Sequence, residues 1–490
     1  MPDFIATLFL PDLERNRPRL TIFYIAALFT AGLVGWGYFF AWGGAPLDFH
    51  DWWDINVPRL LFVQNALQSG QWPLHMADPA SLHDVTDRFL ALPDVMTTPQ
   101  MLLLLVMPVP SFVLVDVLLS YSAGFVGLLL LRRYLNWSLV TLTGVSLLVL
   151  FNGHILSHYS VGHFTWGSYF LFPFVALFVC RFLDGHESWR SVAGFAALIF
   201  YMVLAGGQHH VTWIFLLLTL MIPFCWRRAW WPVSVIVSGG LLSAVRLLPP
   251  ALEVSAFKAR GLVSDVIGYP SIMHLLESLV ILRREVPVPL TETLPGNLSF
   301  FDRSFYEFSA YVGVAGLAVI VVGLYRWWRA AVPIYRELIV PVLAMTMFSI
   351  GSVYRIVRLT QVPLVESERY TARMFSLPLV LMIIIGAIEI DGYLKRASIA
   401  VWQRVLALAA LAAVAIDISA GLRLWRVMIS SGLFGHGRID PATAAIGNHA
   451  DPLYTTTVLA GLALTVITAS VLTVLVSRER VAKVVPGLVP

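Results

Sequence analysis

The sequence predicts an all-α polytopic membrane protein, with about twelve transmembrane helices in a single integral membrane domain over residues 1–490. Of its 490 residues, 58% are hydrophobic and only 13% are charged, whereas soluble globular chains carry about 25% charged residues. The hydrophobic residues also occur in runs close to the ~20 residues that a helix needs to cross the core of a bilayer. This composition excludes a water-soluble enzyme, and nothing in it indicates a nucleic-acid partner.

Windows of about 19 residues locate the predicted spans. Several of them are short for a full crossing, so their ends are placed only to within a few residues. The predicted spans are 20–42, 111–131, 138–153, 166–182, 191–206, 211–226, 232–249, 309–328, 337–351, 375–390, 401–421 and 455–476.

The distribution of arginine predicts the orientation. Short loops at alternate ends of the spans contain pairs such as Arg132 and Arg133 or Arg227 and Arg228, and such loops stay in the cytoplasm. Both termini are then cytoplasmic, and we expect a multi-pass protein of the bacterial inner (plasma) membrane. The outer face receives three long polar loops, about residues 43–110, 250–308 and 422–454.

The first outer loop places three carboxylates, Asp48, Asp51 and Asp54, directly after a span. Apolar residues between positions 55 and 63 follow a helical spacing, which predicts an amphipathic helix along the membrane surface. Trp52, Trp53 and Trp72 are expected to anchor this helix among the lipid headgroups. The acids would then lie where a water-exposed substrate meets a lipid-borne one, although solvated interface acids have the same spacing.

Several motifs follow one another at the predicted outer edges. Asp51 precedes Pro58 by seven residues, and the run Gln68-Ser-Gly-Gln-Trp-Pro-Leu-His75 comes next. Further motifs are Gly162-His163, Ala205 to His209, Leu247 to Glu253, Tyr306 to Gly313 and Glu368 to Phe375. Over residues 45–380 this order resembles bacterial YfhO-type membrane proteins, which are similar in architecture to GT-C glycosyltransferases. The chain departs from that pattern at His75, where the family has Trp, and at the Arg373 motif, which lacks a proline.

The resemblance implies a glycosyltransferase that moves a sugar from a polyprenyl-phosphate carrier at the outer face, in cell-envelope glycosylation. The acceptor would be a glycan, a lipid or a protein, and membrane lipids would surround the site. An inverting transfer needs a carboxylate to take a proton from the acceptor hydroxyl. Asp51 aligns with the family's loop aspartate and is the first candidate, Asp48 the second and Asp54 the third.

The leaving phosphate needs cationic donors, and a guanidinium can contact it with two hydrogen bonds. Arg373 and Arg369 match the resembling motif, and Arg246, Arg59 and Arg88 lie near the outer edge or near the acids. Each of these side chains could instead snorkel to the membrane surface or pair with a carboxylate.

Histidines gather at the same edge. His163 and His209 are candidates for hydrogen bonding to sugar hydroxyls, with His154, His158 and His210 nearby. No acidic ligand accompanies these histidines in the sequence, so we expect no metal site and no cofactor. A divalent metal stays an alternative because neutral imidazoles bind Zn²⁺.

Two other functions stay open. A polytopic lipid or polysaccharide transporter would line its path with polar groups, but few ionisable residues fall at the centres of the predicted spans. The acids Asp116 and Asp417 lie inside predicted spans, both near outer ends, where an ion pair or hydrogen bond also explains them. A non-catalytic GT-C-like subunit would use the long outer loops to dock onto a partner in an envelope complex.

Overall fold

The computed structural model describes residues 3–254, 266–283, 304–330, 334–360, 368–396, 399–430 and 441–484, and these residues form a helical protein without any multi-residue strand. Its α-helices are α1 (Asp3–Phe9), α2 (Pro11–Arg15), α3 (Pro18–Phe39), α4 (Val57–Gln68), α5 (Val109–Leu135), α6 (Leu139–Leu150), α7 (Gly153–Ser160), α8 (Phe172–Leu183), α9 (Trp189–Leu204), α10 (Gln208–Met221), α11 (Trp230–Leu242), α12 (Ala244–Ala251), α14 (Ile272–Val280), α16 (Gly313–Arg329), α17 (Ile339–Phe348), α18 (Gly351–Arg358), α20 (Ser376–Leu394), α21 (Val401–Ser430) and α22 (Pro452–Val484).

Short helical turns connect these helices. They are η1 (Ala41–Gly43), η2 (Trp52–Asn56), η3 (Ala80–Leu82), η4 (Phe89–Ala91), η5 (Pro99–Leu105), η6 (Phe164–Leu171), η7 (Ile222–Arg228), η8 (Phe305–Glu307), η9 (Arg336–Leu338), η10 (Thr371–Phe375) and η11 (Pro441–Ala444).

Eight helical segments in the described chain are long and apolar enough to cross a membrane, or up to nine if one bent pair is a single span. They coincide with eight of the twelve predicted spans and include Pro18–Phe39, Leu139–Ser160 and Pro452–Val481. The other four predicted spans are also helical, but α9, α16 and α17 have only 16, 17 and 10 residues. The fourth is the pair α11 and α12, which is bent by 71°. The structure therefore supports a multi-pass membrane protein and leaves the number twelve as a prediction.

Local signals explain where the helices that carry the site begin and end. Ser138 caps α6 by accepting a hydrogen bond from the Thr141 amide, and Asn152 caps α7 in the same way through Ile155. The preceding helix, α5, ends at Asn136, whose φ of 54° is left-handed. A left-handed residue therefore ends α5, whereas α6 and α7 follow each other in one apolar helical segment, Leu139–Ser160.

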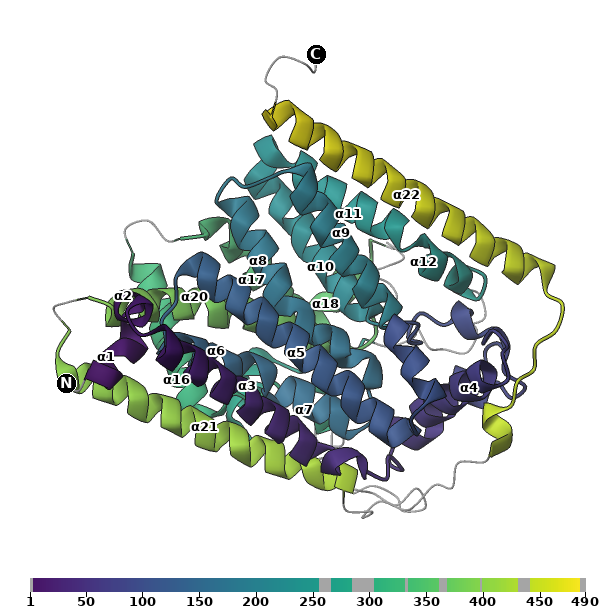
Figure 1. The fold of residues 1–490 in the computed structure, drawn as a ribbon, viewed down its shortest axis with the longest axis horizontal. Coiled ribbons are helices and arrows are strands. Elements are labelled where there is room, and N and C mark those ends of the chain that lie inside the picture. The colour runs from purple at the N-terminus through teal and green to yellow at the C-terminus, as the bar shows by residue number, and fades with distance from the viewer. Residues whose placement is uncertain are drawn as a thin grey trace.

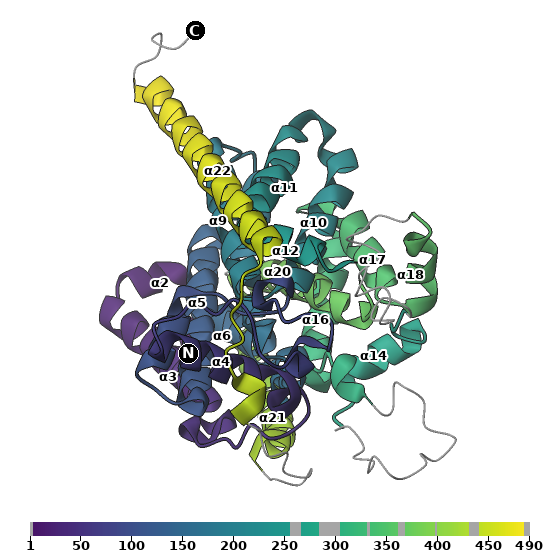
Figure 2. The same cartoon turned by 90° about the vertical axis from the view of Figure 1, so that its right-hand side faces the viewer.

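The long helices form two groups (Figure 1). In one group, α3, α5, α6 and α21 pack together, and in the other α22 lies along α9, α11 and α12. Figure 2 shows the same division from the side, with α22 above and α21 below. Between the groups, α20 packs on α16 and α6 and lies largely inside the protein.

The three long polar loops predicted to face outward contact one another. Residues 75–77 of the first loop pair with residues 445–448 of the third, with the Ala77 amide 2.9 Å from the Ala445 carbonyl oxygen. Arg88 binds both Glu253, at the start of the second loop, and Asp451. The polar loops therefore share one end of the helix bundle.

The helix predicted in the first loop is present as η2 and α4, but it does not lie open along a membrane surface. Its residues Val57, Leu60, Phe62 and Val63 are buried, because α4 packs against η2, η5 and η11. The prediction that Trp52 anchors the helix among the headgroups is also wrong, because its side chain is fully buried. Trp53 and Trp72 are exposed.

Candidate functional site

The loop after α7 positions Asp51. The Asp51 amide donates to the Val161 carbonyl oxygen at 3.1 Å, and the Asn56 amide side chain donates to the Gly162 carbonyl oxygen at 2.6 Å. The indole of Trp52 donates to the Tyr159 carbonyl oxygen at 3.0 Å. One backbone hydrogen bond and two hydrogen bonds from side chains to carbonyl oxygens therefore join segments more than a hundred positions apart around the carboxylate.

Gly162 makes this junction sterically feasible. Its φ is +99°, a conformation that L-residues rarely adopt, and a Cβ atom there would lie 2.2 Å from the Trp52 backbone nitrogen. Only glycine lets the two backbones approach this closely, which gives the Gly162-His163 motif a physical role.

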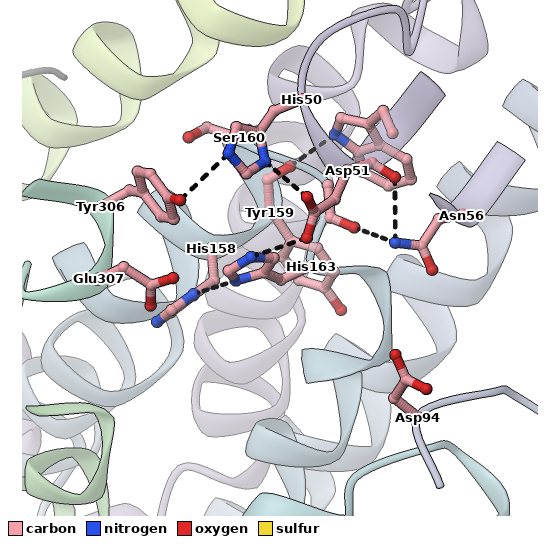
Figure 3. A network of polar contacts seen from close by, with 12 residues as sticks. His50, Asp51, Asn56, Asp94, His158, Tyr159, Ser160, His163, Tyr306 and Glu307 are labelled. Carbon is pink, nitrogen blue, oxygen red and sulfur yellow. Dashed lines mark hydrogen bonds and ion pairs between the residues drawn. The ribbon is translucent and has the colours of Figure 1, made fainter. Parts of the chain in front are cut away.

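Two imidazoles hold the Asp51 carboxylate (Figure 3). His50 Nδ1 lies 2.7 Å from Oδ1, and His163 Nε2 lies 3.2 Å from Oδ2. Burial by itself would raise the pKa of Asp51, but the hydrogen bonds from His163 and His50 outweigh it and hold this pKa well below its usual range. Asp51 is therefore ionised at neutral pH, with a quarter of its side chain (25%) accessible to solvent.

A second hydrogen bond continues from His163 into the protein. His163 Nδ1 lies 2.5 Å from His158 Nδ1, so one of these nitrogens donates and the other accepts. If His163 donates through Nε2 to Asp51, its Nδ1 accepts from His158, and both rings can be neutral. Burial lowers the pKa of His163, which favours that neutral form. In this arrangement, hydrogen bonds are donated from His158 to His163 and from His163 to Asp51.

A buried ion pair lies beside this chain. Arg373 donates to both carboxylate oxygens of Glu307, with Nε and Nη2 each 2.5 Å from an oxygen, and both side chains are almost fully buried. The guanidinium also stacks over the rings of Tyr370 and Trp166, at 4.3 and 5.2 Å from their centroids. Tyr306, which directly precedes Glu307 in the chain, places its hydroxyl 3.2 Å from His50 Nε2.

His158, His163 and Glu307 also have the geometry of a metal site, since one ligand atom from each lies within 4.8 Å of the others. The structure thus supplies the acidic ligand that the sequence did not show. Both oxygens of Glu307 are already bound by Arg373, so the guanidinium takes the position of a cation there. A metal at this place would have to displace Arg373.

The other two predicted acids do not join the carboxylate of Asp51. Asp54 is largely exposed in η2, and partial desolvation together with the negative charge of Asp51 raises its pKa. Asp48 is half-buried in the turn before His50.

Four of the five predicted phosphate-binding arginines are engaged by protein groups: Arg373 binds Glu307, as described above, and three others bind groups of the polar loops. Arg59 binds Asp94 at 3.0 Å and the Ser81 carbonyl oxygen, and Arg88 binds Asp451 and Glu253. The buried Arg246 donates to the carbonyl oxygens of Leu90, Leu92 and Val95 at 2.7 to 3.2 Å. Arg59, Arg88 and Arg246 hold the loop that follows α3, the first of the loops predicted to face outward, in place. Arg369 differs, because its Nε has no hydrogen-bond partner within the described part of the chain.

His209 lies near the same cluster but has another partner. Its Nδ1 is 3.0 Å from Glu368, whose second carboxylate oxygen accepts from the indole of Trp213 at 3.1 Å. The ring of Trp166 stacks on both His209 and His158, with its centroid 6.3 Å from that of His209 and 4.1 Å from that of His158. The histidines of α7 and α10, together with His163 just before η6, therefore surround one tryptophan, Trp166.

The two acids inside predicted spans have ordinary partners. Asp116 accepts from the Gln100 amide at 3.1 Å, and Asp417 accepts from the Ala315 amide at 3.2 Å. Both form hydrogen bonds of the kind that the sequence left open for them.

Four residues of the cluster were not singled out from the sequence. His50 and Glu368 adjoin candidates in the chain, and Tyr306 and Glu307 lie in a motif for which the sequence predicted no role. The available signal was the presence of Glu307 and Glu368 in two of the motifs at the predicted outer edges. Comparison of the chain with protein-family models, with curated proteins and with solved structures finds no match to any of them.

Proposed function

We propose that the protein is a GT-C-like glycosyltransferase of the YfhO type, which transfers a sugar from a polyprenyl-phosphate carrier to an acceptor hydroxyl at the outer face of the bacterial inner membrane. The observation that carries the proposal is the Asp51 cluster: a partly exposed, ionised carboxylate that holds two imidazoles at the polar end of an apolar helix bundle. Such a cluster can take up a proton next to a lipid-borne substrate.

In this proposal Asp51 works together with His50. A carboxylate with a depressed pKa is a weak base by itself, but it orients an imidazole and stabilises the imidazolium that forms. His50 is one-third exposed (33%), and a hydroxyl group, that of Tyr306, already lies 3.2 Å from its Nε2. The acceptor hydroxyl would lose its proton to His50 as its oxygen bonds to the anomeric carbon. The bond from that carbon to the phosphate oxygen breaks, and polyprenyl phosphate leaves.

Arg369 and Arg373 are the proposed cationic partners of the phosphate. Arg369 has an unpaired Nε within the described chain and stacks on Tyr370, 5.0 Å from the ring centroid. Arg373 also lies over the Tyr370 ring, at 4.3 Å from its centroid, and its charge is balanced by Glu307. Two guanidiniums at one aromatic ring favour an anionic ligand there.

A groove between helices offers room for a lipid tail. It has a volume of about 610 Å³ and is lined by α6, α16, α20 and α21, almost entirely with apolar side chains such as Val145, Ile320 and Leu411. Helix α6 passes directly into α7, which carries His158. The groove and the polar cluster are therefore connected by one continuous segment of the chain.

The test is a transfer assay with the full chain in proteoliposomes. Undecaprenyl-phosphate-linked sugar is the probe, and released undecaprenyl phosphate is measured by mass spectrometry. We expect Asp51→Asn and His50→Ala to abolish release, and Asp78→Asn, in the same loop, to leave it unchanged. Release that persists in Asp51→Asn removes Asp51 from the mechanism, and loss in Asp48→Asn alone transfers its role to Asp48.

A non-catalytic subunit is the second candidate, because Arg59, Arg88 and Arg246 serve the internal structure of the outer loops. It predicts stable binding to an envelope protein and no release of polyprenyl phosphate in the same assay. Movement of the intact lipid-linked sugar across the vesicle membrane, without release, would instead favour a transporter.

A further inference from the structure

A second cluster of metal-ligating side chains lies outside the proposed active site. His75 belongs to the first outer loop, and His449 and Asp451 belong to the third. One ligand atom from each lies within 4.8 Å of the others. The backbone holds them together: the His75 amide donates to the Asn448 side chain at 3.0 Å, and the Gly447 amide donates to the His75 carbonyl oxygen at 2.9 Å.

His75 has no hydrogen-bond partner for either ring nitrogen within the described chain, although its side chain is only 1% exposed. A buried polar atom without a partner loses its hydration and gains no hydrogen bond in return, so it destabilises the fold unless a ligand satisfies it. Its Nε2 faces Asp451, at 3.7 Å from Oδ2, and its ring lies 4.2 Å from that of His449. The buried nitrogen is therefore directed at the other two ligands.

The groups behind the ligands fit a metal as well. His449 Nδ1 lies 3.1 Å from the Gly447 carbonyl oxygen and 3.6 Å from Asp87, which fixes the proton on Nδ1 and leaves Nε2 free to coordinate. Metal-binding histidines are usually oriented in this way, by a carbonyl or a carboxylate on the second nitrogen. Arg88 donates to Asp451 Oδ2 at 2.6 Å and the Tyr454 amide donates to Oδ1 at 3.1 Å, so the carboxylate is fixed in orientation and the ion would share Oδ2 with Arg88.

We propose that His75, His449 and Asp451 bind one Zn²⁺ ion, which fastens the first outer loop to the third at the start of α22. Two imidazoles and a carboxylate are a common set of protein ligands for zinc, and a water molecule would complete the tetrahedron. Ligands about 2.0–2.2 Å from the ion lie about 3.3 Å apart, so a shift of a few tenths of an ångström closes the 3.7 Å between His75 and Asp451. The site is independent of the proposed transfer reaction.

Metal binding tests this directly. The full chain, purified in detergent through a tag without histidines and stripped of metal, is equilibrated with Zn²⁺, and bound zinc is counted by mass spectrometry. We expect one Zn²⁺ per chain, a zinc-dependent rise in melting temperature, and a visible absorption band from four-coordinate Co²⁺ when cobalt replaces zinc.

Variants identify the ligands. His449→Ala and Asp451→Asn should lose the ion, and Asp87→Asn should weaken binding roughly 10- to 100-fold. His449 is the safest change because half of its side chain (53%) is exposed, so the variant should fold. His186→Ala is the control and should bind like the parent chain. The proposal is overturned if the chain takes up no stoichiometric zinc, if His449→Ala still binds it, or if His158→Ala loses it instead.

Discussion

Replacing Gly162 by alanine should destabilise the protein and displace Asp51. Two costs add at this position. Alanine at a φ of +99° is strained by about 1–3 kcal/mol. Its Cβ would also lie 2.2 Å from the Trp52 nitrogen and 2.7 Å from the Asp51 carbonyl carbon, both backbone atoms that cannot rotate away. Overpacking of this kind costs about 1–3 kcal/mol, so we expect a total loss of about 2–6 kcal/mol in the free energy of unfolding.

Gly70→Ala is the matched control. Gly70 also has a positive φ, +68°, but a Cβ there meets nothing within 4 Å. It should therefore show the backbone strain alone, about 1 kcal/mol. Both variants are compared by tryptophan fluorescence during titration of the detergent-solubilised chain with a denaturing detergent. If Gly162→Ala unfolds as late as Gly70→Ala, the close contact between the α7 loop and the Asp51 backbone is not a constraint on the fold.

Three more predictions concern the charged groups. Arg373→Met should lower the free energy of unfolding by about 3–5 kcal/mol, because it leaves the buried Glu307 carboxylate unpaired. In the same unfolding titration, the double variant with Glu307→Leu should recover much of that loss. A double variant as unstable as the single one would show that the broken ion pair is not the cause. Because the pKa of Asp51 is lower in the folded than in the unfolded protein, the ionised carboxylate stabilises the fold above its unfolded pKa of about 3.9, and this stabilisation is lost as the pH falls toward the folded pKa. Between pH 7 and pH 2, the melting temperature of Asp51→Asn should therefore fall less steeply at the acid end than that of the parent chain. The same fall in both proteins would be evidence against the paired carboxylate. Arg246→Ala should leave three carbonyl groups without their donor and destabilise the loop around residues 90–95 by at least about 2 kcal/mol. We expect faster amide hydrogen exchange, confined to that loop. Unchanged exchange would contradict the role of Arg246 in holding the loop.

Composition predicted the helical membrane fold because the bilayer, the solvent of this protein, restricts which backbone structures can cross it. A bilayer requires long apolar helices whatever their packing, so eight of the predicted spans recur as long apolar helices. The hydropathy pattern does not report how far a helix continues or where it bends. For this reason α17 stops after 10 residues and α11 meets α12 at 71° within stretches that the sequence predicts as spans.

The site was predicted only in part, for a related reason. Asp51, His163 and Arg373 were named from the sequence, and the structure brings them into one cluster with His158 and Glu307. The arginines could not be sorted from sequence. Arg246 meets three carbonyl groups that lie more than 150 positions away, and no local pattern encodes such partners.

The sequence by itself determined the solvent of this protein, the positions of most of its long helices and the polar residues gathered between them, because those properties follow from local composition and periodicity. The tertiary structure alone decided which polar groups meet. It placed Glu307 on Arg373, both imidazoles on Asp51, and His75 beside His449 and Asp451. Such contacts join segments distant in the chain, and their energies depend on distances of a few ångströms that only the packing of the helices and loops sets.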